Sequence, residues 1–143
     1  MTKSLITQWG QIQRKLAGIQ GRLGAGEESA GWQPNTDVYD GPDGLIVKVE
    51  LAGVPCEGIS IFLEERVLVI EGQRRDPYTG ETGAGYRFRQ MEIEYGPFQR
   101  VIPLPYPVNG RAAMAHCHGG ILEVRLPRAE AVIKKRVTII LQA

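Results

Sequence analysis

The sequence has little of several features that mark specialised classes of protein. Its 143 residues include only two cysteines, Cys56 and Cys117. Two cysteines are too few for a disulfide-built scaffold, and sequence spacing does not decide whether they pair. The formal net charge of +1 lacks the basic excess of a nucleic-acid-binding protein. No window approaches the roughly 18 continuous apolar residues of a membrane span.

The amino-terminal residues also lack the apolar core and small-residue cleavage site of a secretion signal. We therefore expect a cytoplasmic protein with two reduced thiols and with neither a nucleic-acid nor a membrane partner. Apolar residues make up 43% of the chain and charged residues 23%. This balance predicts a globular domain with a buried core.

Signatures of catalysis are missing as well. The chain has no G-x-x-x-x-G-K-S/T phosphate loop and no G-x-S-x-G nucleophile turn. The only dense polar cluster is His116-Cys117-His118, and on a strand its two histidines would share one face while the cysteine faces the other way. A structural zinc site needs four ligands, so we predict no metal, no cofactor and no catalytic residue. A metal- or thiol-dependent enzyme built on these three residues is an alternative that metal analysis would decide.

Residues 1–31 read as an arm made of one helix and a glycine-rich linker. Apolar residues recur there at steps of three and four, which indicates one apolar helical face. That face includes Leu5, Ile6, Trp9, Ile12 and Leu16. A single amphipathic helix cannot bury its own apolar stripe. We expect it to pack on its own domain, on other copies or client proteins, or on a membrane surface, where lipid binding would depend on Trp9.

The period changes from 3.6 to 2 over residues 32–127. Alternating apolar residues, separated by turns rich in Gly, Pro and Asn, predict strands. The predicted strands cover residues 45–51, 59–63, 66–71, 98–104, 112–117 and 121–126. Short strands with almost no helical pattern between them predict an all-β sandwich or barrel.

The patterns of two further segments predict pairing with strands outside their own part of the chain. The long polar connection 73–85 is followed by a short alternating stretch, which we expect to be a strand that pairs with the sheet edge of a second chain. That stretch is Tyr86, Arg87, Phe88, Arg89 and Gln90. The tail, residues 128–143, ends in a second apolar alternation at Val137, Ile139 and Leu141, which is suited to adding a strand to a groove.

Six short motifs, in order over about 110 residues, resemble the α-crystallin domain of the small heat-shock proteins, the Hsp20 family, in its bacterial and plant form. The matching stretches are W-Q-P with D-V-Y-D at 32–40, V-E-L-A-G-V at 49–54, L-V-I-E-G at 68–72, Y-G-P-F-Q-R with L-P at 95–105, A-H-C-H-G-G-I-L at 115–122 and V-T-I at 137–139. The fifth stretch carries the turn motif of Gly119, Gly120 and Leu122, in which Gly119 stands where the family has asparagine. Glycine permits the left-handed backbone that such a turn needs.

The resemblance implies an immunoglobulin-like β-sandwich between a short helical arm and an extended tail. It also implies an ATP-independent chaperone, a holdase that prevents aggregation as a large homo-oligomer of strand-exchanged dimers. The exchanged strand would be Tyr86–Gln90, and Arg100 would occupy a charged position at the dimer interface. The arm would meet unfolding clients.

The resemblance further implies that Val137 and Ile139 of the tail dock into a groove on a neighbouring dimer. The groove maps to Ile59, Ile61, Leu63, Ala113 and Ala115. Two registers stay open for the tail, because Ile139 and Leu141 form a second apolar pair. Pro103 replaces an arginine often found in the family near the dimer interface. A partner-specific co-chaperone-like binding module is the alternative from another class, and such a module would stay monomeric.

Overall fold

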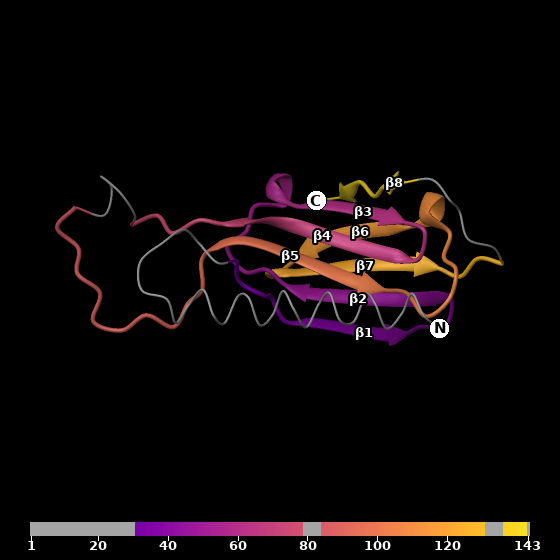
Figure 1. Ribbon diagram of the computed structural model, residues 1–143, viewed down its shortest axis with the longest axis horizontal. Helices are drawn as coiled ribbons and strands as arrows, with labels where there is room; N and C mark the ends of the chain where they lie inside the picture. The colour runs from indigo at the N-terminus through magenta and orange to yellow at the C-terminus, as the bar shows by residue number, and fades with distance from the viewer. Residues whose placement is uncertain (1–30, 79–83, 131–135, 143) are drawn as a thin grey trace.

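The alternating apolar pattern folds into two stacked β-sheets (Figure 1). The computed structural model describes residues 31–78, 84–130 and 136–142. The five-stranded sheet has the order β1-β2-β7-β6-β9. Its strands are β1 (Thr36–Asp40), β2 (Gly44–Glu50), β7 (Ile121–Pro127), β6 (Met114–His118) and β9 (Leu141–Gln142). The four-stranded sheet has the order β5-β4-β3-β8. Its strands are β5 (Gly96–Pro103), β4 (Val67–Arg74), β3 (Ser60–Glu64) and β8 (Val137–Thr138).

The core lies between the sheets and is filled by every second residue of the strands. In β2 the buried side chains are Leu45, Val47 and Val49, whereas the residues between them are partly exposed. Strand β7 pairs antiparallel with β2 and repeats the pattern with Leu122 and Val124, both fully buried. The predicted all-β sandwich is therefore confirmed. The predicted helical arm lies outside the described residues.

Two strand boundaries differ from the prediction for local reasons. Residues 112 and 113 do not start β6, because Gly110–Ala112 forms a 3-10 turn first. The Asn109 side chain caps this turn by accepting a hydrogen bond from the backbone N–H of Arg111. Strand β4 continues to Arg74, three residues past its predicted end, because β5 pairs with it as far as Gly96.

The β6–β7 hairpin turns on Gly119 and Gly120, whose φ angles are 59° and 80°. A two-residue hairpin turn with positive φ at both positions favours glycine. A side chain at Gly120 would also crowd Ala52, whose Cα lies 3.1 Å from the position of the added Cβ. The turn therefore holds segment 51–54 against the end of β6.

Candidate functional site: a strand-binding groove and an exposed loop

The first candidate site is a groove between strand β3 of one sheet and strand β6 of the other. The tail lies in it: β8 pairs antiparallel with β3, and β9 pairs parallel with β6. The backbone N–H of Ile139 also donates to the carbonyl of Ile61, at 3.0 Å. The tail thus satisfies backbone groups at the edges of both sheets, which would otherwise be open for pairing.

Alternate side chains of the tail face into this groove. Ile139 is only 4% exposed and belongs to the core, and Val137 and Leu141 pack beside it, half-buried. Ile140 points the other way and is 79% exposed. Ile139 is therefore the central residue of both registers, with Val137 on the β3 side and Leu141 on the β6 side. In this chain the tail and the groove belong to the same molecule.

The groove residues named from the sequence lie in β3 and β6 or directly before these strands. Ile59, Ile61, Leu63 and Ala115 are buried, and Ala113 is half-buried against the same core. Gly110 was not among the predicted groove residues. A Cβ there would lie 2.9 Å from Leu63 Cδ2 and 3.3 Å from Val137 Cβ, so glycine lets the tail approach closely. The guanidinium of Arg136 lies 3.9 Å from the ring centre of Phe62 and holds the start of the tail.

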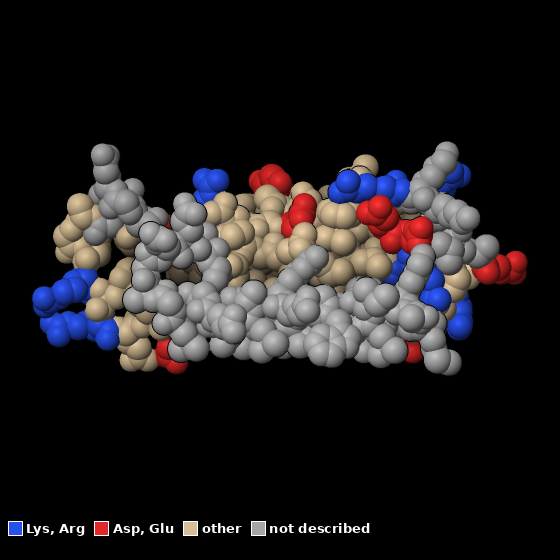
Figure 2. All heavy atoms as spheres, in the orientation of Figure 1, with Lys and Arg blue, Asp and Glu red and all other residues tan. Residues whose placement is uncertain are grey.

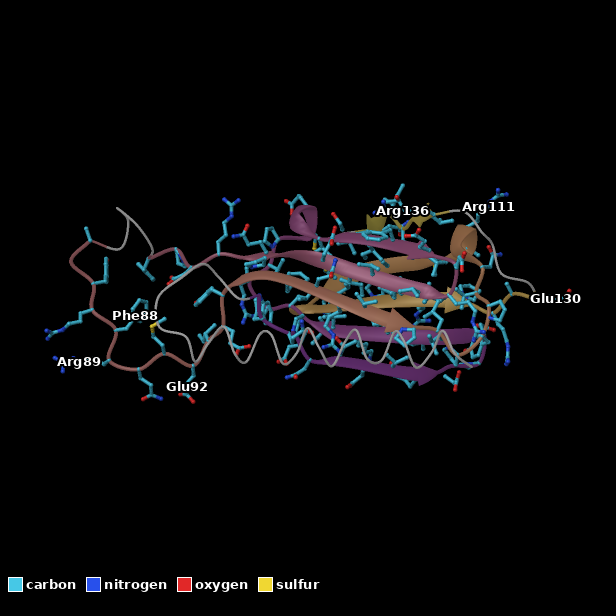
Figure 3. All side chains as sticks on the ribbon, viewed as in Figure 1. Phe88, Arg89, Glu92, Arg111, Glu130 and Arg136 are labelled. Atoms are coloured by element: carbon cyan, nitrogen blue, oxygen red, sulfur yellow. The ribbon has the colours of Figure 1, made fainter. Side chains whose placement is uncertain are left out.

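The second candidate site is the long loop between β4 and β5. It projects beyond one end of the sandwich, and Phe88, Arg89 and Glu92 lie on it, far from Glu130 at the other end (Figure 3). Basic side chains gather at its tip (Figure 2). Large apolar side chains are also exposed on it; they are Tyr86, Phe88, Met91 and Ile93. Such a group of exposed apolar residues is typical of a contact surface.

Residues Tyr86–Gln90 are exposed and form no strand within the single chain, and their pairing with a second chain stays a prediction. A strand needs a neighbour to hydrogen-bond with, and no described strand runs beside this segment. Within it, the Gln90 side-chain amide donates to the Glu92 carboxylate. Among the described strands, β1 likewise has a partner on one side only, and it exposes Val38 and Tyr39.

The root of the loop is held by Arg74, which the sequence analysis treated as an ordinary loop residue. Its Nε donates to the carbonyl of Glu94 at 2.8 Å, and its Nη1 donates to that of Ala52 at 3.2 Å. Its guanidinium also stacks 3.8 Å from the ring centre of Trp32. Trp32 in turn donates to Gly96 and packs edge-on against Phe98. These contacts join both ends of the loop to the sandwich.

Arg100, the predicted dimer charge, is half-buried on β5. Its Nη1 donates to the side chain of Gln33 at 2.8 Å. Its Nε is the one buried side-chain nitrogen or oxygen within the described ranges that has no hydrogen-bond partner. Burial lowers the pKa of Arg100 below its ordinary value. The guanidinium therefore keeps one N–H donor that has no acceptor among the described residues.

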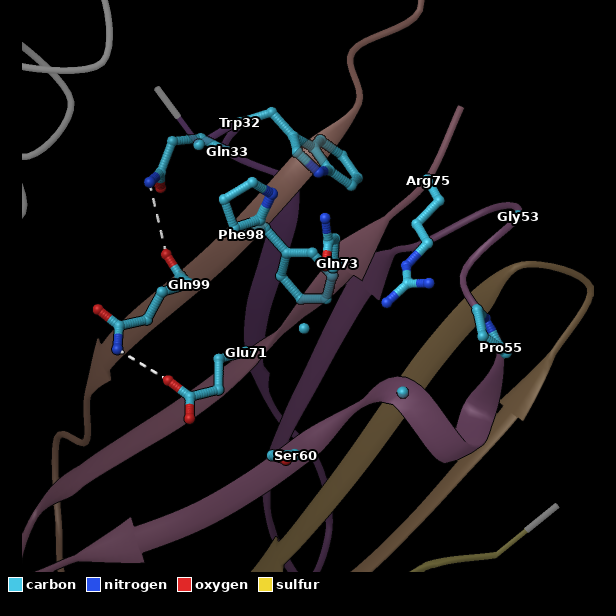
Figure 4. A pocket seen from close by; sticks show the side chains of 14 residues that line it. Trp32, Gln33, Gly53, Pro55, Ser60, Glu71, Gln73, Arg75, Phe98 and Gln99 are labelled. Atoms are coloured by element: carbon cyan, nitrogen blue, oxygen red, sulfur yellow. Dashed lines mark hydrogen bonds between the residues drawn. The ribbon is translucent and has the colours of Figure 1, made fainter. Parts of the chain in front are cut away.

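An open groove of about 1070 Å³ runs over β3, β4 and β5 beside Trp32 (Figure 4). Its polar walls satisfy one another: Gln99 donates to Glu71 at 3.0 Å, and Gln33 donates to the carbonyl of Gln99 at 3.4 Å. Glu71 thus serves as an acceptor for an amide.

The cluster His116-Cys117-His118 lies on β6 with the predicted alternation. Both histidines are exposed and Cys117 turns toward the core. Burial, and to a smaller degree the nearby Cys56 thiol, raises the pKa of Cys117 to about 12. In the described part of the chain, no three His, Cys, Asp or Glu side chains gather as metal ligands would.

The predicted client-binding site falls on a part of the chain that the structure does not describe. The arm residues Leu5, Ile6, Trp9, Ile12 and Leu16 lie outside the described residues. Among the residues that are described, no helix is long and apolar enough to cross a membrane.

Comparison with protein families gives a match over most of the chain. Residues 37–141 match the model of the Hsp20/alpha crystallin family. This range includes β1 from its second residue onward, the loop, the groove and the tail strand β8.

Individual relatives agree with the family match. Small heat shock protein C2 of Rickettsia felis is 35% identical over 68% of this chain, and the match spans 61% of that protein's length. Heat shock protein 16 of Schizosaccharomyces pombe is 32% identical over 74% of each chain. Among solved structures, heat shock protein 16.0 of S. pombe superposes with a TM-score of 0.65 at 30% identity, over 80% of this chain and 86% of that one. The hspA protein of Xanthomonas axonopodis gives 0.63 at 28% identity, over 71% and 98%.

Proposed function

Because this chain belongs to the Hsp20/alpha crystallin family, we propose that it is an ATP-independent holdase that keeps unfolding proteins from aggregating during stress. The family is one of ATP-independent chaperones rather than enzymes. The observation that carries the proposal is the strand-binding groove, in which an apolar tail strand covers two sheet edges. A site of this kind binds by apolar burial and backbone pairing and needs no nucleotide.

The driving force is burial of apolar surface. Unfolding clients expose apolar side chains, and covering them is favourable by roughly 25 cal/mol per Å². We assign client contact to the arm, through Leu5, Ile6, Trp9, Ile12 and Leu16, on the basis of its apolar helical pattern. Deletion of residues 1–24 is expected to reduce client protection while leaving the thermal unfolding of the sandwich unchanged. Full protection by the truncated protein would contradict the assignment.

The proposed assembly begins with a dimer. Segment Tyr86–Gln90 of one copy would pair with the outer edge of β1 in a second copy, because both are exposed and neither has a described strand beside it there. Strand addition of this kind satisfies backbone groups on both sides. Arg100, with its unpartnered Nε, would find an acceptor at that interface.

The dimers would then join through their tails. Val137, Ile139 and Leu141 of one chain would occupy the groove of a neighbour in the way that they occupy their own groove here. The chain accordingly divides into an arm (1–31), a sandwich (32–127) and a tail (128–143). We place the protein in the cytoplasm, as expected from its sequence.

The direct test is light scattering from a heat-labile client protein, with and without this chain, in the absence of ATP. We expect scattering to fall at near-stoichiometric ratios of chaperone to client. Unchanged scattering over a range of temperatures would overturn the holdase proposal and favour the partner-specific binding module.

A further inference from the structure

The two cysteines of the chain lie together although they are far apart in sequence. Cys117 is on β6, where it shares the inward face with Ala115. Cys56 starts the short 3-10 helix η1 (Cys56–Gly58), which leads directly into β3. The Cys56 thiol lies close enough to the Cys117 thiol to contribute, after burial, to the raised pKa of Cys117. Neither thiol is used by the strand-binding function proposed above.

Backbone contacts independent of the thiols hold the two segments in place. The N–H of Leu51 donates to the carbonyl of Gly120 at 2.7 Å, and Gly120 packs against Ala52. The N–H groups of Gly58 and Ile59 close the turn on the carbonyls of Pro55 and Cys56. These contacts hold the β6–β7 hairpin against residues 51 and 52 and close the turn that carries Cys56.

The pair also has a defined position relative to the tail. The tail passes Leu63 at Val137 and Ile61 at Ile139, moving toward the start of β3. On the other wall it passes Ala115 at Leu141 and His116 at Gln142, moving toward Cys117. Cys56 and Cys117 thus stand on opposite walls, at the end of the groove toward which the tail runs.

We propose that Cys56 and Cys117 are a redox modification site, closing to an intrachain disulfide that joins the two walls of the tail groove. The oxidant is a low-molecular-weight disulfide. The thiolate of Cys56 attacks one of its sulfurs, forming a mixed disulfide and releasing one small thiol. The thiolate of Cys117 then attacks the Cys56 sulfur and releases the second small thiol. Two cysteine thiols are oxidised, one small disulfide is reduced, and both cysteine protons pass to the released thiols.

The order of attack follows from the environment of the two thiols. The raised pKa keeps Cys117 protonated at neutral pH, and a protonated thiol is a poor nucleophile. Cys56 lies on a surface turn and reacts first, and Cys117 resolves the mixed disulfide. The reaction accelerates as pH rises, because both attacks need a thiolate.

The disulfide has a consequence for the groove, and this part rests on the proposed function. Joining the start of β3 to β6 fixes the distance between the walls at one end. A tail strand already seated there then leaves more slowly, since leaving requires the walls to part. Oxidation is therefore expected to slow the exchange of subunits between assemblies.

The test uses the full chain incubated with oxidised glutathione at neutral and alkaline pH. Free thiols per chain are expected to fall from two to none, with a monomer on non-reducing gels and a Cys56–Cys117 peptide by mass spectrometry. Cys117→Ala is expected to stop at the glutathione adduct of Cys56. The Cys56→Ala variant is expected to keep the thiol of Cys117 free. Persistence of both thiols in the wild-type chain, or their loss only through dimers linked between chains, would overturn the proposal.

Subunit exchange between fluorescently labelled assemblies then tests the link to the tail, with the Cys117→Ala variant as control. Slower exchange after oxidation, only in the wild-type chain, is the expected result. Equal exchange rates before and after oxidation would overturn that link. The thiol count needs no chaperone activity, so failure of the disulfide and failure of the holdase proposal are distinguishable.

Discussion

Two edges of the same sandwich differ in how they are covered. At the groove between β3 and β6, the chain's own tail supplies the missing strands and buries Ile139. At the outer edge of β1 and along the loop, no described segment plays that part, and Tyr86 and Ile93 are each 63% exposed. An edge with a partner in its own chain can be opened or closed by competition. An edge that no described segment covers is available for pairing with another molecule.

The largest effect on assembly is expected when the exposed loop segment is removed. Replacing residues 78–90 by a short Gly-Ser linker, with Arg74 kept, removes the segment proposed to pair with a second copy. Because the core lies elsewhere, the sandwich is expected to fold and the dimer to be lost. Native mass and circular dichroism check this together. A dimer that persists in a folded variant would reject strand exchange.

Weakening the root of the loop should have a smaller effect on the same surface. Arg74→Met removes two hydrogen bonds from a charged group and the stacking on Trp32. We expect the free energy of unfolding to fall by about 2 kcal/mol and the dimer to dissociate at higher protein concentrations. Arg75→Met is the matched control, with no expected change. Urea unfolding and dilution measurements check both variants, and identical dissociation curves would argue against a positioning role for Arg74.

Features of the fold that depend on neighbouring residues could be predicted from the sequence, whereas contacts between distant segments could not. Strands β2 and β7 were predictable, because an apolar residue at every second position is a local property of the sequence. They carry Leu45, Val47 and Val49, and Leu122 and Val124, respectively. The placement of Ile139 and Leu141 on one face followed in the same way. Arg74 and the two cysteines were not identified as contacts. Their partners are separated from them in sequence by turns whose geometry no local pattern encodes.

The covered edge should respond to a smaller change at Gly110. Gly110→Ala places a methyl group against Leu63 and Val137, and overpacking of this kind costs about 1 kcal/mol. We expect the tail to be cleaved faster by protease, because it leaves the groove more often. Arg111→Ala, at the exposed neighbouring position, is the control. Equal cleavage rates in the two variants would show that the close approach does not matter.

The effect that is smallest at neutral pH concerns Cys117, because it appears only as pH rises above that thiol's ordinary pKa. Its pKa is raised in the folded chain from an ordinary value of 9.0 to about 12, chiefly by burial. The folded state therefore holds a proton that the unfolded state releases, and the stability from this group falls as pH rises through that interval. Cys117→Ala should flatten the pH dependence of unfolding there. A decline with pH equal to that of the wild-type chain would contradict the assignment.

The central claim is that the covered and uncovered edges serve different levels of assembly. The most direct measurement is native mass spectrometry of Ile139→Ala beside Ile140→Ala. Ile139 is buried in the groove and Ile140 is exposed, so the two changes remove the same atoms from opposite faces of one strand. We predict that Ile139→Ala leaves dimers and that Ile140→Ala keeps the large assembly. Large assemblies in both variants, or monomers in Ile139→Ala, would contradict the account.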